Sequence, residues 1–336
     1  GSVEEMWMAF SNGATLVCGD KTTPRFGGTA SYAGHVAKYW FEQVAGIPVE
    51  LDIASEFRYR EPPMTGDEVA IFISQSGETA DTLAALRYVT GKARHTIAVV
   101  NVIESSIARE VDIILPILAG PEIGVASTKA FTSQLGTLAC TAILAGRMRG
   151  NITGDEERDL IAKLLELPRA LTEILGHEHV AAQIAQDMAN AQDILFLGRG
   201  TMFPIALEGA LKLKEISYIH AAGHASGELK HGPIALVDDK VPVVVMAPRD
   251  ALFDKTASNM QEVIARGGKV VLVTDRAGAA EAGDKIWRMM VLPDVDPFAA
   301  PILYAVPAQL IAYFAALAKG TDVDQPRNLA KSVTVE

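Results

Sequence analysis

An apolar run meets a polar loop in Val69-Ala-Ile-Phe-Ile-Ser74-Gln75-Ser76-Gly77-Glu78-Thr79-Ala80-Asp81-Thr82-Leu83. The β-branched and aromatic residues that end at Ser74 predict a buried strand. Apolar residues recur with helical spacing after Thr79, which predicts a helix that starts there or one residue later. A junction of this kind points unpaired backbone N–H groups and the positive end of a helix dipole at one place, and it therefore favours an anion.

The loop has the side chains that a phosphate ester needs. Ser74, Ser76 and Thr79 offer hydroxyl donors, and Gly77 lets the backbone come close to a ligand. The loop contains no Lys or Arg, and the Gly-x-x-x-x-Gly-Lys-Ser/Thr pattern of nucleotide triphosphatases is absent. The sequence predicts an uncharged cup for a monophosphate. The alternative is an ordinary strand–helix turn with polar caps.

Composition limits the class of protein. The 336 residues are 49% hydrophobic and 21% charged, which is typical of a packed globular chain with room for two domains. The net charge of −11 argues against a nucleic-acid or membrane-surface partner. Two cysteines, Cys18 and Cys140, are too few for a disulfide framework, and no signal peptide is recognised, so we expect a cytoplasmic protein. The apolar stretch 302–317 contains Pro307 and Gln309 and predicts a buried helix rather than a membrane span.

Strand-like and helical stretches alternate along the chain. This alternation predicts an α/β fold with two doubly wound parallel sheets, a first domain at 1–150 and a second at 184–319. The charged helical stretch 151–183 reads as a linker, and residues 320–336 form a polar, non-regular C-terminal tail. The predicted strands and helices are 68–74, 80–90, 96–102, 112–116, 129–147, 193–197, 204–218, 241–247, 254–266, 269–274 and 287–292.

A faint internal repeat supports two related units. Gly28-Thr29 and Gly200-Thr201 are each followed by a helical run and, at similar spacing, by an apolar strand. The first copy then continues into the hydroxyl loop, whereas the second continues into Ala247-Pro248-Arg249-Asp250. We therefore expect one phosphate site per chain, in the first unit.

The second half carries candidate acid–base groups. Lys212 is four residues from Glu208 and three from Glu215, so all three share one helix face. Surface ion pairs would explain this pattern, but the apolar residues on both sides favour burial, and a buried Lys beside a carboxylate suits proton transfer. His231 lies in a turn-prone stretch and is a candidate proton donor or an exposed side chain without a role.

A metal site is disfavoured. His220 and His224 are four residues apart, which is the spacing of two metal ligands on one helix face. No third ligand of suitable spacing accompanies them, and Gly223 weakens a helix at this place. We expect no metal.

Taken together, seven stretches resemble the isomerase half of the glucosamine-6-phosphate synthases, also called glutamine–fructose-6-phosphate amidotransferases. The resemblance covers roughly residues 28–336 and implies two sugar-isomerase (SIS) domains acting on fructose 6-phosphate. The stretches are 39–42, 53–60, 74–82, 122–131, 206–220, 227–233 and 320–336, the last of them highly specific.

The resemblance also implies a role for individual residues. Lys331 would form a Schiff base with C2 of the ketose, Glu215 would move a proton between C1 and C2 with help from Lys212, and His231 would open the sugar ring. No metal or organic cofactor takes part in this scheme. The phosphate and sugar would be held by Thr29, Ser74, Gln75, Ser76, Thr79, Val125 and Ser127.

Partners follow from the same resemblance. It implies a homodimer in which His231 serves the neighbouring subunit's site, and a glutaminase domain that supplies ammonia but has no counterpart in this sequence. The substrates would be fructose, glucose and glucosamine 6-phosphates in amino-sugar biosynthesis. One departure concerns Thr29, because the polar stretch 20–25 separates Gly28-Thr29 from the strand-like 14–18. An insertion there and an unrelated N-terminal region both remain open, and Ala30 lacks a hydroxyl that many members have.

Three hypotheses of function remain open from the sequence. The leading one is the isomerase portion of an amidotransferase. The second is a stand-alone sugar-phosphate isomerase or a glucosamine-6-phosphate deaminase. The third is a sugar-phosphate-sensing module, although no helix-turn-helix segment or basic patch is visible.

Overall fold

The computed structural model describes residues 14–18 and 28–332 of the chain. These residues form two compact units. The first contains 14–18, 28–123, 127–162 and 330–332, and the second contains 124–126 and 163–329. The division after residue 162 falls inside the helical stretch 151–183, where α7 (Gly154–Leu165) runs.

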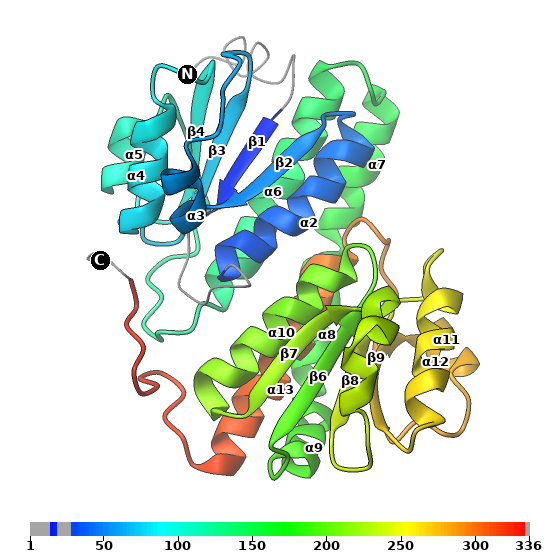
Figure 1. The fold of residues 1–336 in the computed structure, drawn as a ribbon. Coiled ribbons are helices and arrows are strands. Elements are labelled where there is room, and N and C mark those ends of the chain that lie inside the picture. Colours follow the sequence, from blue (N-terminus) through cyan, green and yellow to red (C-terminus); the bar gives the residue numbers. More distant parts are fainter. Residues whose placement is uncertain (1–13, 19–27, 333–336) are drawn as a thin grey trace. The chain divides into compact units, whose positions relative to one another are not determined.

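Among the described residues, the first unit has a five-stranded sheet in the order β2-β1-β3-β4-β5, and all neighbouring strands are parallel. Each strand is followed by a helix (Figure 1). The elements are β1 (Ala14–Cys18), α2 (Thr29–Val44), β2 (Val49–Ile53), α3 (Ala54–Arg60), β3 (Val69–Ser74), α4 (Ala80–Val89), β4 (His95–Val100), α5 (Ser106–Glu110), β5 (Ile113–Pro116) and α6 (Lys129–Met148).

Strand β3 is central and lacks a polar face. All six of its residues are buried, as expected of a parallel strand that has helices on both sides. Phe72 and Ala70 belong to the core formed with α3, α4 and α5, while α2 and α6 pack against each other. Burying a side chain such as Phe72 contributes about 1.5–3 kcal/mol, so the position of Ser74 at the end of this strand is firmly fixed.

The second unit repeats this design. Its described sheet has the order β10-β9-β8-β6-β7, again with parallel neighbours. Its elements are α8 (Leu167–Gly176), α9 (Glu178–Met188), β6 (Asp193–Gly198), α10 (Met202–Ser217), β7 (His220–Ala225), the 3₁₀ turns η1 (Ser226–His231) and η2 (Pro233–Leu236), β8 (Pro242–Met246), α11 (Phe253–Ile264), β9 (Lys269–Asp275), α12 (Arg276–Glu281), β10 (Arg288–Leu292) and α13 (Ala300–Lys319).

Helix α13 is the predicted buried helix. It is long and apolar enough to cross a membrane, but 67% of its most apolar window is buried inside the protein. It packs against α10 and α9, and Pro307 is accommodated within it. Burial against two helices explains an apolar composition that water would not tolerate on a free helix.

The two sheets share one strand order. Numbered from the first strand of each unit, both read 2-1-3-4-5, which is the predicted doubly wound arrangement. The order reverses between β1 and β3 in the first unit and between β6 and β8 in the second. Ligands of such sheets bind at this reversal, beyond the carboxyl ends of the strands. The hydroxyl loop follows β3 and therefore lies at a switch point.

Candidate active site

The loop after β3 is organised around the Ser74 hydroxyl. Ser74 is 1% exposed, its Oγ accepts a hydrogen bond from the Gly77 backbone N (3.0 Å), and it lies 3.4 Å from Thr79 Oγ1. The Ser76 hydroxyl accepts from the Glu78 N at 3.2 Å, and Gln75 is half-buried beside it. The predicted hydroxyls are thus gathered into one tight turn.

Gly77 is required by the geometry of this turn. Its φ is +67°, and a Cβ there would lie 2.0 Å from the Ser105 hydroxyl oxygen. The Gly77 carbonyl accepts from Ile107 N (3.0 Å), and Glu78 Oε1 accepts from Ser106 N (2.7 Å). Helix α5 therefore fixes the loop from one side.

Thr79 is the N-cap of α4, but its side chain does not cap the helix. The first N–H groups of a helix have no partner within it, so those of α4 are donors that an anion at this place could use. Thr29, 4% exposed, begins α2 after β1, the strand that neighbours β3. Two helix N-termini thus follow adjacent strands at the switch point, with neutral donors that suit a phosphate dianion.

Strand β1 helps to explain how the N-terminal region of this chain differs from the family pattern. Its backbone pairs with both β2 and β3, so the strand-like segment 14–18 is an integral part of the sheet. The polar stretch 20–25 lies outside the described residues. An intervening segment between a genuine core strand and Gly28-Thr29 therefore fits better than an unrelated N-terminal region.

The corresponding place in the second unit is built differently. Gly198 ends β6, and a Cβ there would meet the Met202 carbonyl oxygen at 2.1 Å. After β8, Arg249 N donates to Asp275 Oδ2 (2.6 Å) and its guanidinium pairs with Glu281 (2.8 Å). Charged side chains that already pair with one another replace the hydroxyl cup, in keeping with a phosphate site in the first unit.

Within the first unit, Lys331 contacts the loop before α6. Lys331 Nζ donates to Glu122 Oε2 at 2.8 Å, and Glu122 Oε1 accepts from the backbone N of Thr128 (2.8 Å) and of Ala130 (3.3 Å). Ser127 lies half-buried in the same loop. Burial alone raises the pKa of Glu122, but the Lys331 and Thr128 hydrogen bonds outweigh it and hold the pKa below its usual value.

Val125 belongs with the tail residues of the second unit. Its backbone N donates to the Asp324 carbonyl at 2.9 Å. The tail is also held at the C-terminal end of α10, where the Thr321 hydroxyl donates to the Ile216 carbonyl (2.6 Å). Arg327 N donates to the Tyr218 hydroxyl (2.8 Å), and its guanidinium stacks over that ring at 4.3 Å. These hydrogen bonds hold the tail, which has no helix or strand here, at Thr321, Asp324 and Arg327.

Helix α10 buries a charged triad. Lys212 Nζ donates to Glu215 Oε2 at 2.6 Å and lies 3.5 Å from Glu208 Oε1. The side chains of Lys212 and Glu208 are 2% and 0% exposed, and that of Glu215 is 16% exposed. The shared helix face is as predicted, and burial rules out the surface-ion-pair alternative. The partly open Glu215 is placed to exchange a proton, with a fixed ammonium beside it.

The neighbouring Lys214 shows how burial disfavours the charged form of a lysine. Burial lowers the pKa of Lys214, and the Glu215 carboxylate only partly opposes this effect. Lys212, more deeply buried, has two carboxylates within 3.5 Å. Desolvation of an ammonium is offset only where carboxylates are this close.

His231 ends the turn η1 and is exposed. The turn itself is firmly held, because Leu229 is fully buried in the core of the second unit and Lys230 pairs with Glu262 at 2.9 Å. A rigid turn thus presents an imidazole to solvent or to another molecule.

The two other histidines of interest lie on a strand. His220 and His224 are both in β7, and His220 Nδ1 lies 2.6 Å from Asp193 Oδ1. Within the described residues, no cluster of three or more His, Cys, Asp or Glu could hold a metal ion. Their four-residue spacing places the two histidines on one face of a strand and not on one face of a helix.

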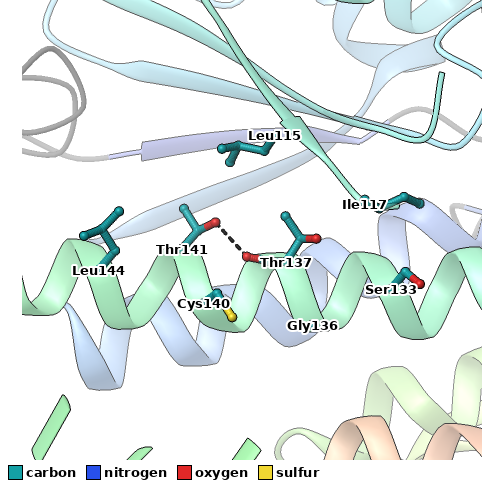
Figure 2. A pocket seen from close by; sticks show the side chains of 8 residues that line it. All are labelled: Leu115, Ile117, Ser133, Gly136, Thr137, Cys140, Thr141 and Leu144. Carbon is teal, nitrogen blue, oxygen red and sulfur yellow. Dashed lines mark hydrogen bonds between the residues drawn. The ribbon is translucent and has the colours of Figure 1, made fainter. Parts of the chain in front are cut away.

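A separate hollow lies beside the edge strand of the first unit. It has a volume of about 520 Å³ and lies between β5 and α6 (Figure 2). Its lining is Leu115, Ile117, Ser133, Gly136, Thr137, Cys140, Thr141 and Leu144, with no charged side chain. The Thr141 hydroxyl donates to the Thr137 carbonyl at 2.7 Å, and Cys140 is exposed. None of the predicted site residues lines this hollow.

Two features of the site escaped the sequence analysis. Glu122 lies in a stretch that carries the family resemblance, but no local pattern connects it to Lys331, 209 residues away. Tyr218 adopts a left-handed conformation (φ +61°) at the end of α10 and holds the tail through its hydroxyl. Long-range pairs of this kind leave no periodic signal in the sequence.

Comparison with known proteins identifies the class. The model of the SIS domain matches residues 27–144 and 187–319, one copy in each unit. The chain belongs to the SIS domain family. Strand β1 lies ahead of the first matched range.

The more specific likeness is to one group of enzymes. The chain is 62% identical over 309 residues to a glutamine–fructose-6-phosphate aminotransferase (isomerizing) of Bradyrhizobium diazoefficiens, and 59% identical to that of Mesorhizobium japonicum. Each alignment covers 92% of this chain and 51% of the relative, so the chain spans about half the length of these curated relatives.

A solved structure gives the same result in three dimensions. The C-terminal domain of glucosamine-fructose-6-phosphate aminotransferase from Francisella tularensis superposes with a TM-score of 0.91 at 41% identity. The match covers 96% of this chain and 89% of that one. The predicted resemblance to the isomerase part of this enzyme group is confirmed.

Proposed function

We propose that this chain isomerises fructose 6-phosphate and, when ammonia is supplied, forms glucosamine 6-phosphate. The observation that carries the proposal is the hydroxyl cup Ser74–Thr79 at the switch point of a SIS domain, in a chain that closely resembles the isomerase part of the aminotransferases. An uncharged cup at a helix N-terminus suits a phosphate monoester.

The phosphate group would be held by the hydroxyls of Ser74, Ser76 and Thr79, with Gln75 and Thr29 close by. These residues lie in the loop after β3 and at the start of α2, where helix N-termini add backbone donors. Val125 and Ser127 would contact the sugar from the loop before α6.

The chemistry would follow from an amine and a carboxylate. Lys331 attacks C2 of the open-chain ketose, and loss of water gives an imine that makes the C1 proton more acidic. In the isomerisation, Glu215 takes a proton from C1 of the free open-chain ketose to give an enediol and returns it at C2, while O1 gives its proton to O2 and Lys212 fixes the Glu215 carboxylate at 2.6 Å. In the amination, ammonia displaces the lysine from C2, and the same proton transfer leaves an amine at C2 and an aldehyde at C1.

The setting of the reaction is part of the proposal. His231, exposed on a rigid turn, would open the sugar ring in the site of a partner subunit, which makes the working unit a homodimer. The ammonia would come from a glutaminase domain. The reaction would be the entry to amino-sugar synthesis in the cytoplasm.

The proposal is tested by trapping the imine. The chain is incubated with fructose 6-phosphate and borohydride, and its peptides are then analysed by mass spectrometry. A hexose phosphate adduct on Lys331 is expected, with none in Lys331→Arg and an unchanged yield in Lys319→Arg, which alters a lysine at the end of α13. Absence of an adduct on any lysine would remove the central step.

Product analysis in both directions separates the alternatives. With fructose 6-phosphate and ammonia, the aminotransferase reading predicts glucosamine 6-phosphate as the product. A deaminase would instead favour release of ammonia from glucosamine 6-phosphate, and a stand-alone isomerase would give glucose 6-phosphate whether or not ammonia is present.

A further inference from the structure

Glu122 has the features of a device that controls Lys331. Its side chain is 4% exposed, whereas that of Lys331 is 27% exposed, and the two meet at 2.8 Å. The carboxylate is thus desolvated while the amine stays open to a reactant. Ion pairs in which one partner is this deeply buried resist screening by salt.

The other oxygen of Glu122 fixes the direction of the carboxylate. Oε1 accepts from Thr128 N at 2.8 Å and Ala130 N at 3.3 Å, at the start of α6. The side chain of the N-cap residue Thr128 does not cap the helix, so Glu122 caps it from six residues upstream. A helix N-terminus stabilises a carboxylate, so Glu122 stays ionised while it binds the amine.

This arrangement fixes the position of the Lys331 amine. The carboxylate holds Nζ in one place through a charge-assisted hydrogen bond at 2.8 Å. We propose that Glu122 is a positioning residue that keeps the Lys331 amine aimed until a carbonyl substrate arrives. This role rests on the proposed function, in which Lys331 forms the imine.

Burial alone raises the pKa of Glu122. Among the described residues, this effect is opposed by the charged side chain of Lys331 and by the backbone N–H groups of Thr128 and Ala130. Glu122→Gln keeps an oxygen for those N–H groups and removes only the charge. It therefore separates the effect on Lys331 from the capping of α6. Glu122→Asp keeps the charge but withdraws it by one methylene.

The first experiment needs no sugar. The full chain is reductively methylated with formaldehyde and cyanoborohydride near neutral pH, and the modification of Lys331 is followed by peptide mass spectrometry. We expect Lys331 in Glu122→Gln to react about tenfold faster than in the wild type, because its amine is no longer held in the ion pair. Glu122→Asp should be intermediate, and the other lysines should not change.

Glu110→Gln is the matched control, because it removes a carboxylate of the same unit whose ion-pair partner is Arg87. It should leave Lys331 labelling at the wild-type rate. If Glu122→Gln does not fold, as judged by circular dichroism, Glu122→Asp carries the test. A wild-type rate of Lys331 labelling in a folded Glu122 variant overturns the proposal.

The second experiment uses fructose 6-phosphate with ammonia and separates this proposal from the proposed function. In Glu122→Gln, kcat should fall about tenfold because the amine is no longer aimed, while KM stays within about twofold because the phosphate cup is untouched. If the wild type forms a sugar adduct but the Lys331 labelling rate is the same in the wild type and in the Glu122 variants, the positioning role alone is refuted. A wild type that forms no adduct refutes the proposed function, whatever the labelling shows.

Discussion

Replacing Lys212 by Met should reveal the energy held in the α10 triad. Met preserves most of the buried stem but removes an ammonium that lies 2.6 Å from Glu215 Oε2 and 3.5 Å from Glu208 Oε1. Glu208 is fully buried, so its carboxylate would lose this positive charge without gaining water. The predicted effect is a large loss of stability in the second unit.

The magnitude follows from the burial of each partner. Removing one member of a buried ion pair costs about 3–5 kcal/mol, and the 16% exposure of Glu215 places this case near the lower end. We expect a loss of about 3 kcal/mol, which corresponds to a fall in Tm of about 6–12 °C for a unit of this size. Adding Glu208→Gln to Lys212→Met should restore part of the loss, because it removes the buried negative charge.

The assay is thermal unfolding of the full chain by calorimetry, with Lys214→Met as the control. Burial lowers the pKa of Lys214, so its charge is unfavourable in the folded state, and its removal should change stability by less than about 1 kcal/mol. A Lys212→Met variant that melts within about 2 °C of the wild type would refute the reasoning, as would equal losses in both variants.

Three further predictions concern other parts of the chain. Gly77→Ala should destabilise the first unit by about 1–3 kcal/mol, because the added Cβ would meet the Ser105 hydroxyl. The same variant should abolish fructose 6-phosphate binding measured by calorimetry. Gly91→Ala is the control and should bind normally, since Gly91 has a similar φ (+77°) and a Cβ there would have no atom within 4 Å. Tyr304→Phe should leave Tm unchanged or raise it by a few degrees, since the Tyr304 hydroxyl is buried without a hydrogen-bond partner in the described part of the chain. The folded state holds the pKa of Glu122 below its usual value of 4.5. The Glu122 carboxylate therefore stabilises the fold above pH 4.5, and this contribution is lost as the pH falls through the lowered pKa. Acid unfolding of Glu122→Gln should depend less steeply on pH than that of the wild type.

Much of the fold was predictable because the strands are strongly patterned. Runs such as Val69–Ser74 are buried on both faces, so they stand out as continuous apolar segments next to amphipathic helices. The predicted ends of β3, α4 and β5 agree with the structure to within one residue. Strand β7 was missed because its sequence, His-Ala-Ala-Gly-His-Ala, lacks the β-branched residues that mark a strand.

The candidate site was predictable where its residues are neighbours in sequence. The hydroxyl turn Ser74–Thr79 and the Lys212–Glu215 pair are local, so spacing alone brings their side chains together. The burial of Lys212 could be inferred only from its apolar neighbours. The pairing of Lys331 with Glu122 depends on the path of the whole chain, which no local pattern encodes.

A crystal structure of the chain soaked with fructose 6-phosphate tests the central claim most directly. The account predicts phosphate oxygens within hydrogen-bond distance of the Ser74, Ser76 and Thr79 hydroxyls, at the N-terminus of α4, and the sugar carbonyl carbon bonded to Lys331 Nζ. A ligand bound elsewhere, with the turn after β3 empty, would contradict it.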